Sequence, residues 1–278
     1  METRNLKSFS YLEDGTVSCQ ILAINETTPQ LNSGFYQLDA VINQYKYEPL
    51  LSVLTTENIK GEGIKYKELE PFFEYLGSFQ DVSNINTIES LGYKHKLGLI
   101  LHGKQGTGKT VVTRAIADKV LKNNGIVINI NTSIILGMPC LLSFLKDLRK
   151  VHTQQMLFIF DECEVILKEL ENLFKNFLDG YDSIHNSISV FTTNYLDRVP
   201  TPIYERPSRI KFSIELRGIS DEDTIEKMLT TALNVKPTAE TIKSLMGCTA
   251  DEIKEYIIDK ILKITTKKDK KPTLGFKR

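Results

Sequence analysis

Gly103-Lys-Gln-Gly-Thr-Gly-Lys-Thr110 is the stretch of sequence that decides the fold. It has the pattern G-x-x-x-x-G-K-[ST], in which the glycines let the backbone curl so that several N–H groups point at one anion. An apolar run, residues 97–102, comes directly before it, and residues 110–124 follow with apolar side chains on one helical face. A strand, a loop and a helix in this order are the context in which the pattern binds phosphate. The stretch therefore predicts a phosphate-binding loop.

The side chains of this loop complement its backbone. Lys109 is expected to reach the β and γ phosphates of ATP, and the Thr110 hydroxyl is expected to ligate Mg²⁺. The positive end of the following helix adds to the attraction for the anion. The alternative reading is a glycine-rich structural turn. The predicted binding residues for ATP are Gly103, Gln105, Gly106, Thr107, Gly108, Lys109, Thr110 and Val111.

Met156-Leu-Phe-Ile-Phe-Asp161-Glu162 supplies the acidic half of the predicted site. A buried strand places the carboxylate that follows it at the edge of a parallel sheet where ligands bind. Asp161 is expected to hold Mg²⁺ through its water shell, and Glu162 to polarise the attacking water. Without the phosphate loop, the two acids would be read as the cap of the next helix.

Ser189-Val-Phe-Thr-Thr-Asn194 is a further buried strand that ends in polar residues. Asn194 is expected to hydrogen-bond both the γ phosphate and the attacking water. Taken without the flanking motifs, it would be read as a turn residue.

Apolar runs and helical patterns alternate along the middle of the chain. Such alternation predicts a parallel sheet covered on both faces. Five strands are expected at residues 97–102, 126–130, 156–160, 188–191 and 210–216, with helices at 110–124, 141–151 and 163–181.

The flanks of this core have other patterns. Residues 1–60 read as a strand-rich N-terminal segment, and the core is expected to span 61–216, with a helix at 67–75 and a polar connector at 80–86. Helical patterns over 217–266 predict a small helical domain. The basic tail at 267–278 is expected to be solvated, with a nucleic-acid contact as the weaker alternative.

Composition excludes several classes of protein. The 35 basic and 35 acidic residues balance, so net charge gives no argument for or against nucleic acid. Apolar runs are too short to span a bilayer, and the N-terminus has no signal core. The four cysteines lack C-x-x-C spacing, which argues against a zinc site. No membrane association is expected, and the expected location is the cytoplasm, or the host cytoplasm if the chain is viral.

Together these motifs resemble the AAA+ superfamily of ATPases, and within it the AAA subgroup that includes the mitochondrial Rieske-protein translocase branch and its bacterial and phage relatives. The stretches that carry the resemblance are the phosphate loop, Phe158-Ile-Phe-Asp-Glu, Phe177-Leu-Asp-Gly180, Val190-Phe-Thr-Thr-Asn-Tyr-Leu-Asp-Arg198, Tyr204-Glu-Arg-Pro-Ser-Arg209 and Gly247-Cys-Thr-Ala-Asp-Glu-Ile253.

The resemblance implies an α/β P-loop NTPase core with a five-stranded parallel sheet and a helical lid. It further implies a homo-oligomeric, usually hexameric, ring with ATP at the subunit interfaces. Arg209 matches the arginine finger that reaches a neighbouring subunit's site, and Arg206 is a candidate helper, with a structural salt bridge as its alternative.

Three positions depart from the family pattern. Phe212 stands where many relatives carry a second finger, and Lys211 stands where many carry Asp. Ile135 stands on the pore loop in place of the aromatic residue that grips a threaded polypeptide, and a buried helix–loop contact is an equally good reading of residues 134–138.

Two functions are compatible with these residues. The first is an ATPase that uses hydrolysis to remodel an unidentified protein client. The alternative is a nucleotide-dependent loader or switch that acts on a nucleic-acid machine, since both classes share the same ATP site. A catalytically silent binding module would require damage to the site, and the quoted residues carry none.

Overall fold

A computed structural model of the chain describes residues 5–11, 17–23, 31–43, 46–54, 66–181 and 183–262. The chain divides into two compact units, Met1–Arg217 and Gly218–Arg278. The predicted basic tail lies outside the described residues. Among the helices of the described ranges, none combines the length and the apolar character needed to cross a bilayer.

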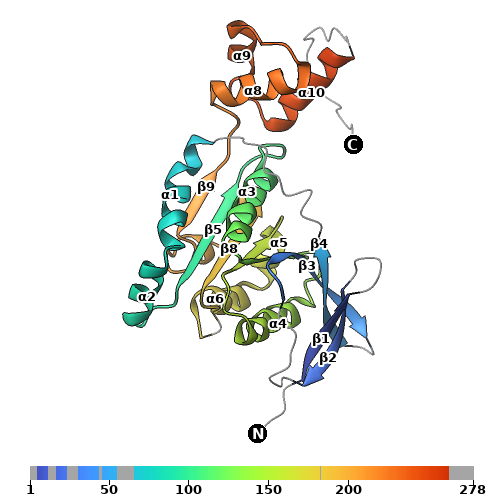
Figure 1. Cartoon of the computed structure of the whole chain (residues 1–278), viewed down its shortest axis with the longest axis vertical. Coiled ribbons are helices and arrows are strands. Elements are labelled where there is room, and N and C mark those ends of the chain that lie inside the picture. The colour runs from blue at the N-terminus through green and yellow to red at the C-terminus, as the bar shows by residue number, and fades with distance from the viewer. Residues whose placement is uncertain are drawn as a thin grey trace, which may run out of the picture. The chain divides into compact units, whose positions relative to one another are not determined.

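A seven-stranded mixed sheet forms the centre of the first unit (Figure 1). Its strand order is β4-β3-β6-β7-β8-β5-β9. From β3 to β9 the neighbouring strands are parallel, and β4 pairs antiparallel with β3. The strands are β3 (Gly34–Asn43), β4 (Lys46–Leu54), β5 (Lys96–His102), β6 (Ile126–Ile130), β7 (Met156–Phe160), β8 (Ser187–Thr193) and β9 (Phe212–Glu215).

All five predicted strands are present and parallel, but the sheet is larger than the prediction. The two additional strands, β3 and β4, come from the segment before residue 60, and β3 pairs with β6 from Gly34↔Ile126 to Leu38↔Ile130. Tyr36 and Leu38 are buried on one face of this extension. Sequence alternation indicated strands here, yet pairing between segments about 90 residues apart cannot be read from a local pattern.

The remaining described strands, β1 (Asn5–Tyr11) and β2 (Val17–Ala23), form a separate two-stranded antiparallel sheet. The register runs from Asn5↔Ala23 to Tyr11↔Val17.

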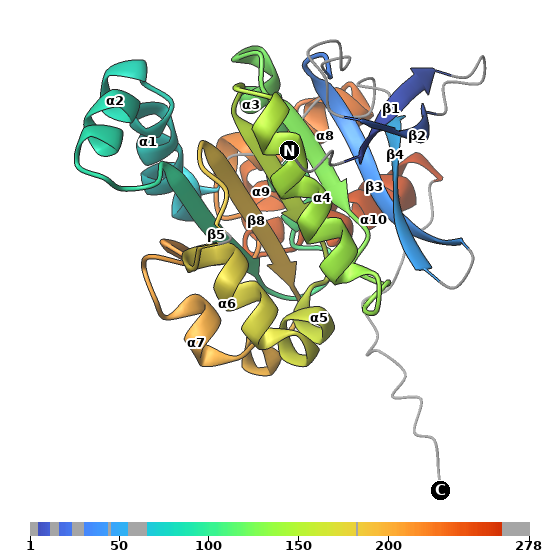
Figure 2. The same ribbon diagram turned by 90° about the horizontal axis from the view of Figure 1, so that it is seen from below.

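Alternate side chains of each strand point to opposite faces of the large sheet. Helices cover both of these faces (Figure 2). One face carries the main hydrophobic core, in which Phe160 stacks on Phe191 at 4.7 Å and meets Phe174 edge-on at 5.5 Å. The helices of this unit are α1 (Glu70–Phe79), α2 (Val82–Ser90), α3 (Lys109–Lys122), α4 (Met138–Val151), α5 (Glu164–Glu169), α6 (Glu171–Asp179) and α7 (Thr201–Tyr204).

Two predicted elements differ from the structure. The long helix expected at 163–181 is two helices, because Leu170 (φ −118°, ψ 34°) leaves the helical region between α5 and α6. The connector expected at 80–86 contains the start of α2, which Asp81 caps by accepting a bond from the Ser83 N–H at 2.8 Å. A polar composition hid this helix, because α2 buries none of its residues.

The second unit consists of three described helices, α8 (Glu222–Leu233), α9 (Ala239–Leu245) and α10 (Ala250–Ile261). Asp221, Thr238 and Thr249 cap their N-termini with side-chain oxygens, as such residues commonly do. Thr249 and Glu252 form a reciprocal capping box. The helical signals of the sequence in this region are confirmed.

Candidate functional site

The carboxyl edge of the sheet brings three predicted motifs together. Strand order places β8 between β5 and β7, and all three strands are parallel. The phosphate loop follows β5, Asp161 follows β7 and Asn194 follows β8. Since parallel strands end at one edge, the predicted ATP, Mg²⁺ and water-positioning residues lie there side by side.

The phosphate loop depends on its glycines at two close approaches. Gly103 (φ 142°) lies so near the backbone of Leu216 that a Cβ would come within 2.2 Å of its carbonyl oxygen. Gly108 (φ 91°) is the N-cap of α3, and a Cβ there would come within 2.1 Å of the Tyr66 Oη. Both positions combine a backbone conformation suited to glycine with a lack of space for any side chain.

Tyr66 holds the loop from outside the motif. Its hydroxyl donates to the carbonyl of Thr107 at 2.7 Å, and the side chain is almost completely buried. This contact was not predicted from the sequence. No local signal points to it, because the two residues are 41 positions apart.

Lys109 is buried within the loop. Its ammonium group donates to the carbonyls of Gly103 at 2.7 Å and Lys104 at 2.9 Å. Burial lowers the pKa of Lys109, and the nearby carboxylates of Asp161 and Glu162 oppose that shift. The lysine is therefore oriented toward the inside of the loop, where an anion would lie. Of the other predicted binding residues, Thr107 is buried, Gly106 and Val111 are half-buried, and Gln105 and Thr110 are exposed.

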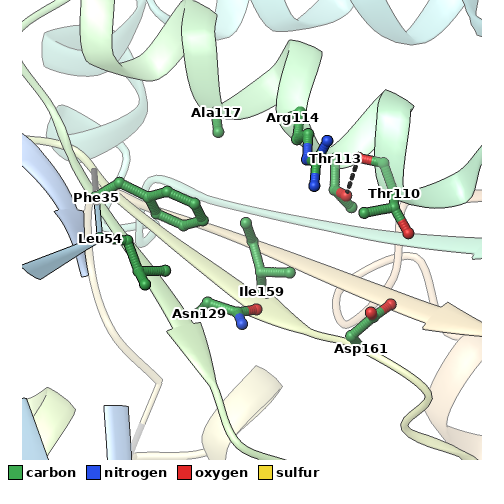
Figure 3. Close-up of a pocket in the computed structure, with 9 residues that line it drawn as sticks. All are labelled: Phe35, Leu54, Thr110, Thr113, Arg114, Ala117, Asn129, Ile159 and Asp161. Carbon is green, nitrogen blue, oxygen red and sulfur yellow. Dashed lines mark hydrogen bonds between the residues drawn. The ribbon is translucent and has the colours of Figure 1, made fainter. Parts of the chain in front are cut away.

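A pocket of about 260 Å³ opens beside Thr110 and Asp161 (Figure 3). The apolar side of its wall includes Phe35 and Leu54 of the N-terminal strands, whereas Arg114 of α3 lies near the polar side. The Thr110 hydroxyl and the Asp161 carboxylate are the hard oxygen donors that Mg²⁺ prefers. The two predicted metal residues thus line one cavity, and their chemistry fits this ion.

Glu162 adopts a backbone conformation that is unusual for a residue with a side chain. Its φ is 48°, in the left-handed region, and its carboxylate is exposed. The Asn194 amide donates to Glu162 Oε1 at 3.4 Å. Strained backbone of this kind often lies at functional sites, and here it turns the carboxylate toward the predicted water-positioning residue.

Thr192 of β8 contacts both acids of the site, and no role was predicted for it from the sequence. Its hydroxyl donates to Asp161 Oδ1 and accepts a bond from the Glu162 N–H at 3.0 Å. Its carbonyl accepts a bond from the N–H of Cys163 at 2.9 Å. The available signal was the polar end of a buried strand, Thr-Thr-Asn, of which only Asn194 was assigned.

The structure does not bring Arg209 and Arg206 to the phosphate loop of their own chain. Arg209 lies at the amino end of β5, where the N–H of the nearby Lys211 donates to the Gly98 carbonyl at 2.9 Å. The loop follows the other end of that strand. Arg209, the predicted finger, and Arg206, its candidate helper, therefore lie at the opposite edge of the sheet from the predicted ATP site.

At this amino edge, three cationic side chains lie around the carboxylate of Asp179. Its carboxylate lies 3.3 Å from Arg206 Nη1, 3.8 Å from Arg209 Nε and 3.5 Å from the ammonium of Lys96. It also accepts a bond from the Ser208 hydroxyl at 2.9 Å. Three cations thus share one carboxylate, and the Arg209 side chain beside it is 11% exposed.

Phe212 and Lys211, which depart from the family pattern, pack against α1. The Phe212 ring lies edge-on to Phe72 at 5.5 Å and to Tyr75 at 5.4 Å. The Lys211 ammonium sits 4.7 Å from the centre of the Tyr75 ring. These side chains attach α1 to the edge strand β9, which gives both departures a structural explanation.

The loop between β6 and α4 presents a different residue from the one expected on it. Ile135 is half-buried and packs against the main core, whereas Leu136 is 76% exposed. The chain turns back at Gly137, where a Cβ would come within 2.7 Å of the Ala40 Cβ. This loop therefore packs against the N-terminal strand β3.

Comparisons with known proteins agree with this geometry. Residues 99–217 match the model of the ATPase family associated with various cellular activities (AAA). The chain is similar to the vesicular-fusion protein SEC18 of Candida albicans, with 26% identity over 158 residues that make up 48% of the chain and 20% of that protein. It is similar to the 26S proteasome regulatory subunit 8 homolog of Saccharomyces cerevisiae, with 27% identity over 259 residues, which cover 81% of the chain and 60% of that protein. The chain thus spans less than two thirds of the length of either relative.

Proposed function

We propose that this chain, which contains a domain of the AAA ATPase family over residues 99–217, binds MgATP at the carboxyl edge of its sheet and hydrolyses it. The observation that carries the proposal is the meeting of the phosphate loop, Asp161 and the Glu162–Asn194 pair at that edge. A glycine-rich turn with a purely structural role would not require acids and an amide at the ends of two neighbouring strands.

The binding step rests on the loop and its helix. Backbone N–H groups between Gly103 and Val111 and the N-terminus of α3 bind the phosphates. Lys109 exchanges its carbonyl partners within the loop for the β and γ phosphates. Thr110 and Asp161 would hold Mg²⁺, and the ion would supply positive charge beside the transferred phosphoryl group.

The hydrolytic step rests on Glu162 and Asn194. Glu162 accepts a proton from the attacking water, and its exposed carboxylate is free to face that water. Asn194 donates to Glu162 in this structure, and during turnover it orients the water and the γ phosphate. Glu162 and Asn194 already lie within hydrogen-bonding distance of each other, as this step requires.

The active form is a homo-oligomeric ring, with a hexamer as the expected size. Arg209 and Arg206 lie at the sheet edge opposite their own phosphate loop, so they can serve only the site of a neighbouring copy. A guanidinium at the γ phosphate stabilises charge in the transition state. Asp179 holds both arginines at the face that the neighbour meets.

Hydrolysis drives conformational remodelling of a protein client in the cytoplasm. Leu136 is the apolar residue that the loop before α4 presents to a polypeptide, whereas its neighbour Ile135, which stands in the place expected of an aromatic residue, packs against the core. Two similar proteins, a vesicular-fusion protein and a proteasome regulatory subunit, support a protein client by the functions for which they are named. The narrower assignment to the Rieske-translocase branch rests on the sequence resemblance.

Two substitutions test the site directly. Glu162→Gln is expected to keep ATP affinity within about 3-fold while turnover falls at least about 100-fold, because general-base catalysis contributes on that order. Radiolabelled ATP hydrolysis measures turnover, and calorimetry with Mg²⁺ measures binding. Full turnover in Glu162→Gln would refute the assignment of the base, and no magnesium-dependent ATP uptake by the parent would refute the whole proposal.

A second experiment identifies the class of client. Turnover of the parent oligomer is measured with an unfolded protein and, separately, with single- and double-stranded DNA. Stimulation by the unfolded protein supports remodelling of a protein client. Stimulation by DNA alone would replace that client with a nucleic-acid machine.

A further inference from the structure

Thr192 lies at the centre of the acidic half of the site. It belongs to β8, which runs between the strand that precedes the phosphate loop and the strand that precedes Asp161. Its side chain is fully buried, and it faces the loop that follows β7. No other side chain of the described residues bonds to both Asp161 and Glu162.

The Thr192 hydroxyl satisfies two partners that act in different ways. It donates to Asp161 Oδ1, which fixes the plane of the carboxylate that lines the pocket beside Thr110. It accepts a bond from the Glu162 N–H at 3.0 Å. That bond supports a residue whose left-handed backbone (φ 48°) is unfavourable for a side-chain-bearing residue.

The backbone of Thr192 completes the contact. Its carbonyl accepts bonds from the N–H of Cys163 at 2.9 Å and from the Cys163 thiol at 3.2 Å. Three consecutive residues after β7 are therefore tied to one residue of β8. The turn that carries both acids cannot shift without breaking these bonds.

We propose that Thr192 is a positioning residue, whose hydroxyl sets Asp161 for Mg²⁺ and Glu162 for water through the same pair of hydrogen bonds. This inference rests on the proposed function. Hydrogen-bond partners of metal-holding residues commonly change metal affinity or activity by about 10- to 100-fold when they are lost. Because both acids depend on one hydroxyl, its removal affects the metal and the chemistry together.

Thr192→Val tests the proposal, since valine keeps the branched shape of threonine and lacks the hydroxyl. We expect the Mg²⁺ concentration for half-maximal turnover to rise about 10-fold and kcat to fall about 10- to 100-fold. The KM for ATP at saturating Mg²⁺ is expected to change less than about 3-fold, because the phosphate loop is intact. Thr192→Ser restores the hydroxyl and is expected to recover most of both losses.

A readout without turnover separates metal binding from chemistry. Calorimetry of ADP binding with and without Mn²⁺ measures how much the metal strengthens nucleotide binding. In Thr192→Val this gain is expected to shrink about 10-fold, in line with the Mg²⁺ dependence of turnover.

Ser187→Ala is the matched control, because Ser187 is a buried hydroxyl residue of the same strand that donates to the Ile184 carbonyl at 2.7 Å. It lies at the other end of β8 from the acids. Equal losses in Ser187→Ala and Thr192→Val would reduce Thr192 to a structural role. If Thr192→Val does not fold, Thr192→Ser and Thr192→Ala are compared in its place.

The two proposals fail in different ways. Normal kcat and Mg²⁺ dependence in Thr192→Val, beside an inactive Glu162→Gln, would overturn the role of Thr192 alone. A parent protein that binds no nucleotide would overturn the proposed function.

Discussion

The two edges of the large sheet handle charge in opposite ways. At the carboxyl edge, Asp161, Glu162 and Thr110 are exposed, and open glycine-rich backbone lies beside them. At the amino edge, Asp179 gathers Lys96, Arg206 and Arg209, and the described contacts pair most of this charge within the chain. One edge has polar groups available for a ligand, whereas at the other edge the charged groups are paired with one another.

Arg149 is a further cation of the amino edge, and backbone carbonyls rather than a carboxylate hold it there. Its guanidinium donates to the backbone carbonyls of His152, Gln154, His185 and Asn186 at the amino edge. Burial lowers its pKa to about 10, so it remains charged near neutral pH. Substitutions at the carboxyl edge should therefore alter nucleotide binding and turnover with little effect on stability. Substitutions at the amino edge should lower stability and leave nucleotide binding in the same copy largely unchanged.

Lys109→Ala is expected to give the largest effect. Loss of the buried ammonium removes the cation that faces the phosphates, and turnover is expected to fall about 1,000-fold or more with a loss of ATP binding. The midpoint of urea unfolding is expected to change little, because burial disfavours the charged form of Lys109 and so offsets the stability gained from its hydrogen bonds. Calorimetry and urea unfolding on the same preparation measure both. A large fall in the urea midpoint of Lys109→Ala, together with the loss of ATP binding, would contradict the proposed difference between the two edges.

Asp179→Asn is expected to reverse that pattern. The three cations around it lose their shared negative charge, and the free energy of unfolding is expected to fall by about 2 kcal/mol, less than for a fully buried pair because the carboxylate is 20% exposed. Calorimetric affinity for MgATP is expected to stay within about 2-fold.

Asp118→Asn is the control for Asp179→Asn, since its pair with Lys122 lies on the surface of α3. Exposed pairs of this kind contribute about 0.5 kcal/mol or less. An equal loss in both variants would contradict the special role of the charges at the amino edge.

Acid pH is expected to give the smallest and most gradual effect, and it acts on the amino edge. Burial lowers the pKa values of His95 and His152 in the folded protein. The unfolded chain therefore binds protons at these residues first, so stability is highest above about pH 6.5 and declines as the pH falls below it. Urea unfolding between pH 8 and pH 5 measures this decline.

His95→Gln is expected to flatten part of that decline. Two further side chains lie close to His95: His185 accepts a bond from the His95 backbone N–H at 3.1 Å, and its ring lies 2.7 Å from the Glu89 carboxylate. His185→Gln separates their contribution. A pH dependence that is unchanged in both variants would place its origin outside this cluster.

Much of the fold was predictable because its signals are local. Apolar runs such as Met156–Phe160 have the length and the burial of central strands, and the five predicted strands all occur. The break at Leu170 was not predictable, because the residues around it continue a helical pattern. The joining of β3 to β6 was not predictable either, because it depends on the packing of distant segments.

The candidate site divides in the same way. Motif residues such as Lys109 and Asp161 are identified by type and spacing, because the chemistry of phosphate and Mg²⁺ restricts both. Supporting residues such as Tyr66, Asp179 and Thr192 carry no such restriction. Many residue types could fill those positions in another chain, so only their contacts reveal them.

The phosphate loop, the acidic strand end and the alternation of strands and helices can all be read from local sequence, because each is a short pattern with its own physical requirement. The residues that hold that site in place, and the sheet edge that Arg209 occupies, depend on tertiary packing. Those features arise when distant segments pack, so that a hydroxyl of β8 meets the acids after β7 while the arginines lie at the far edge.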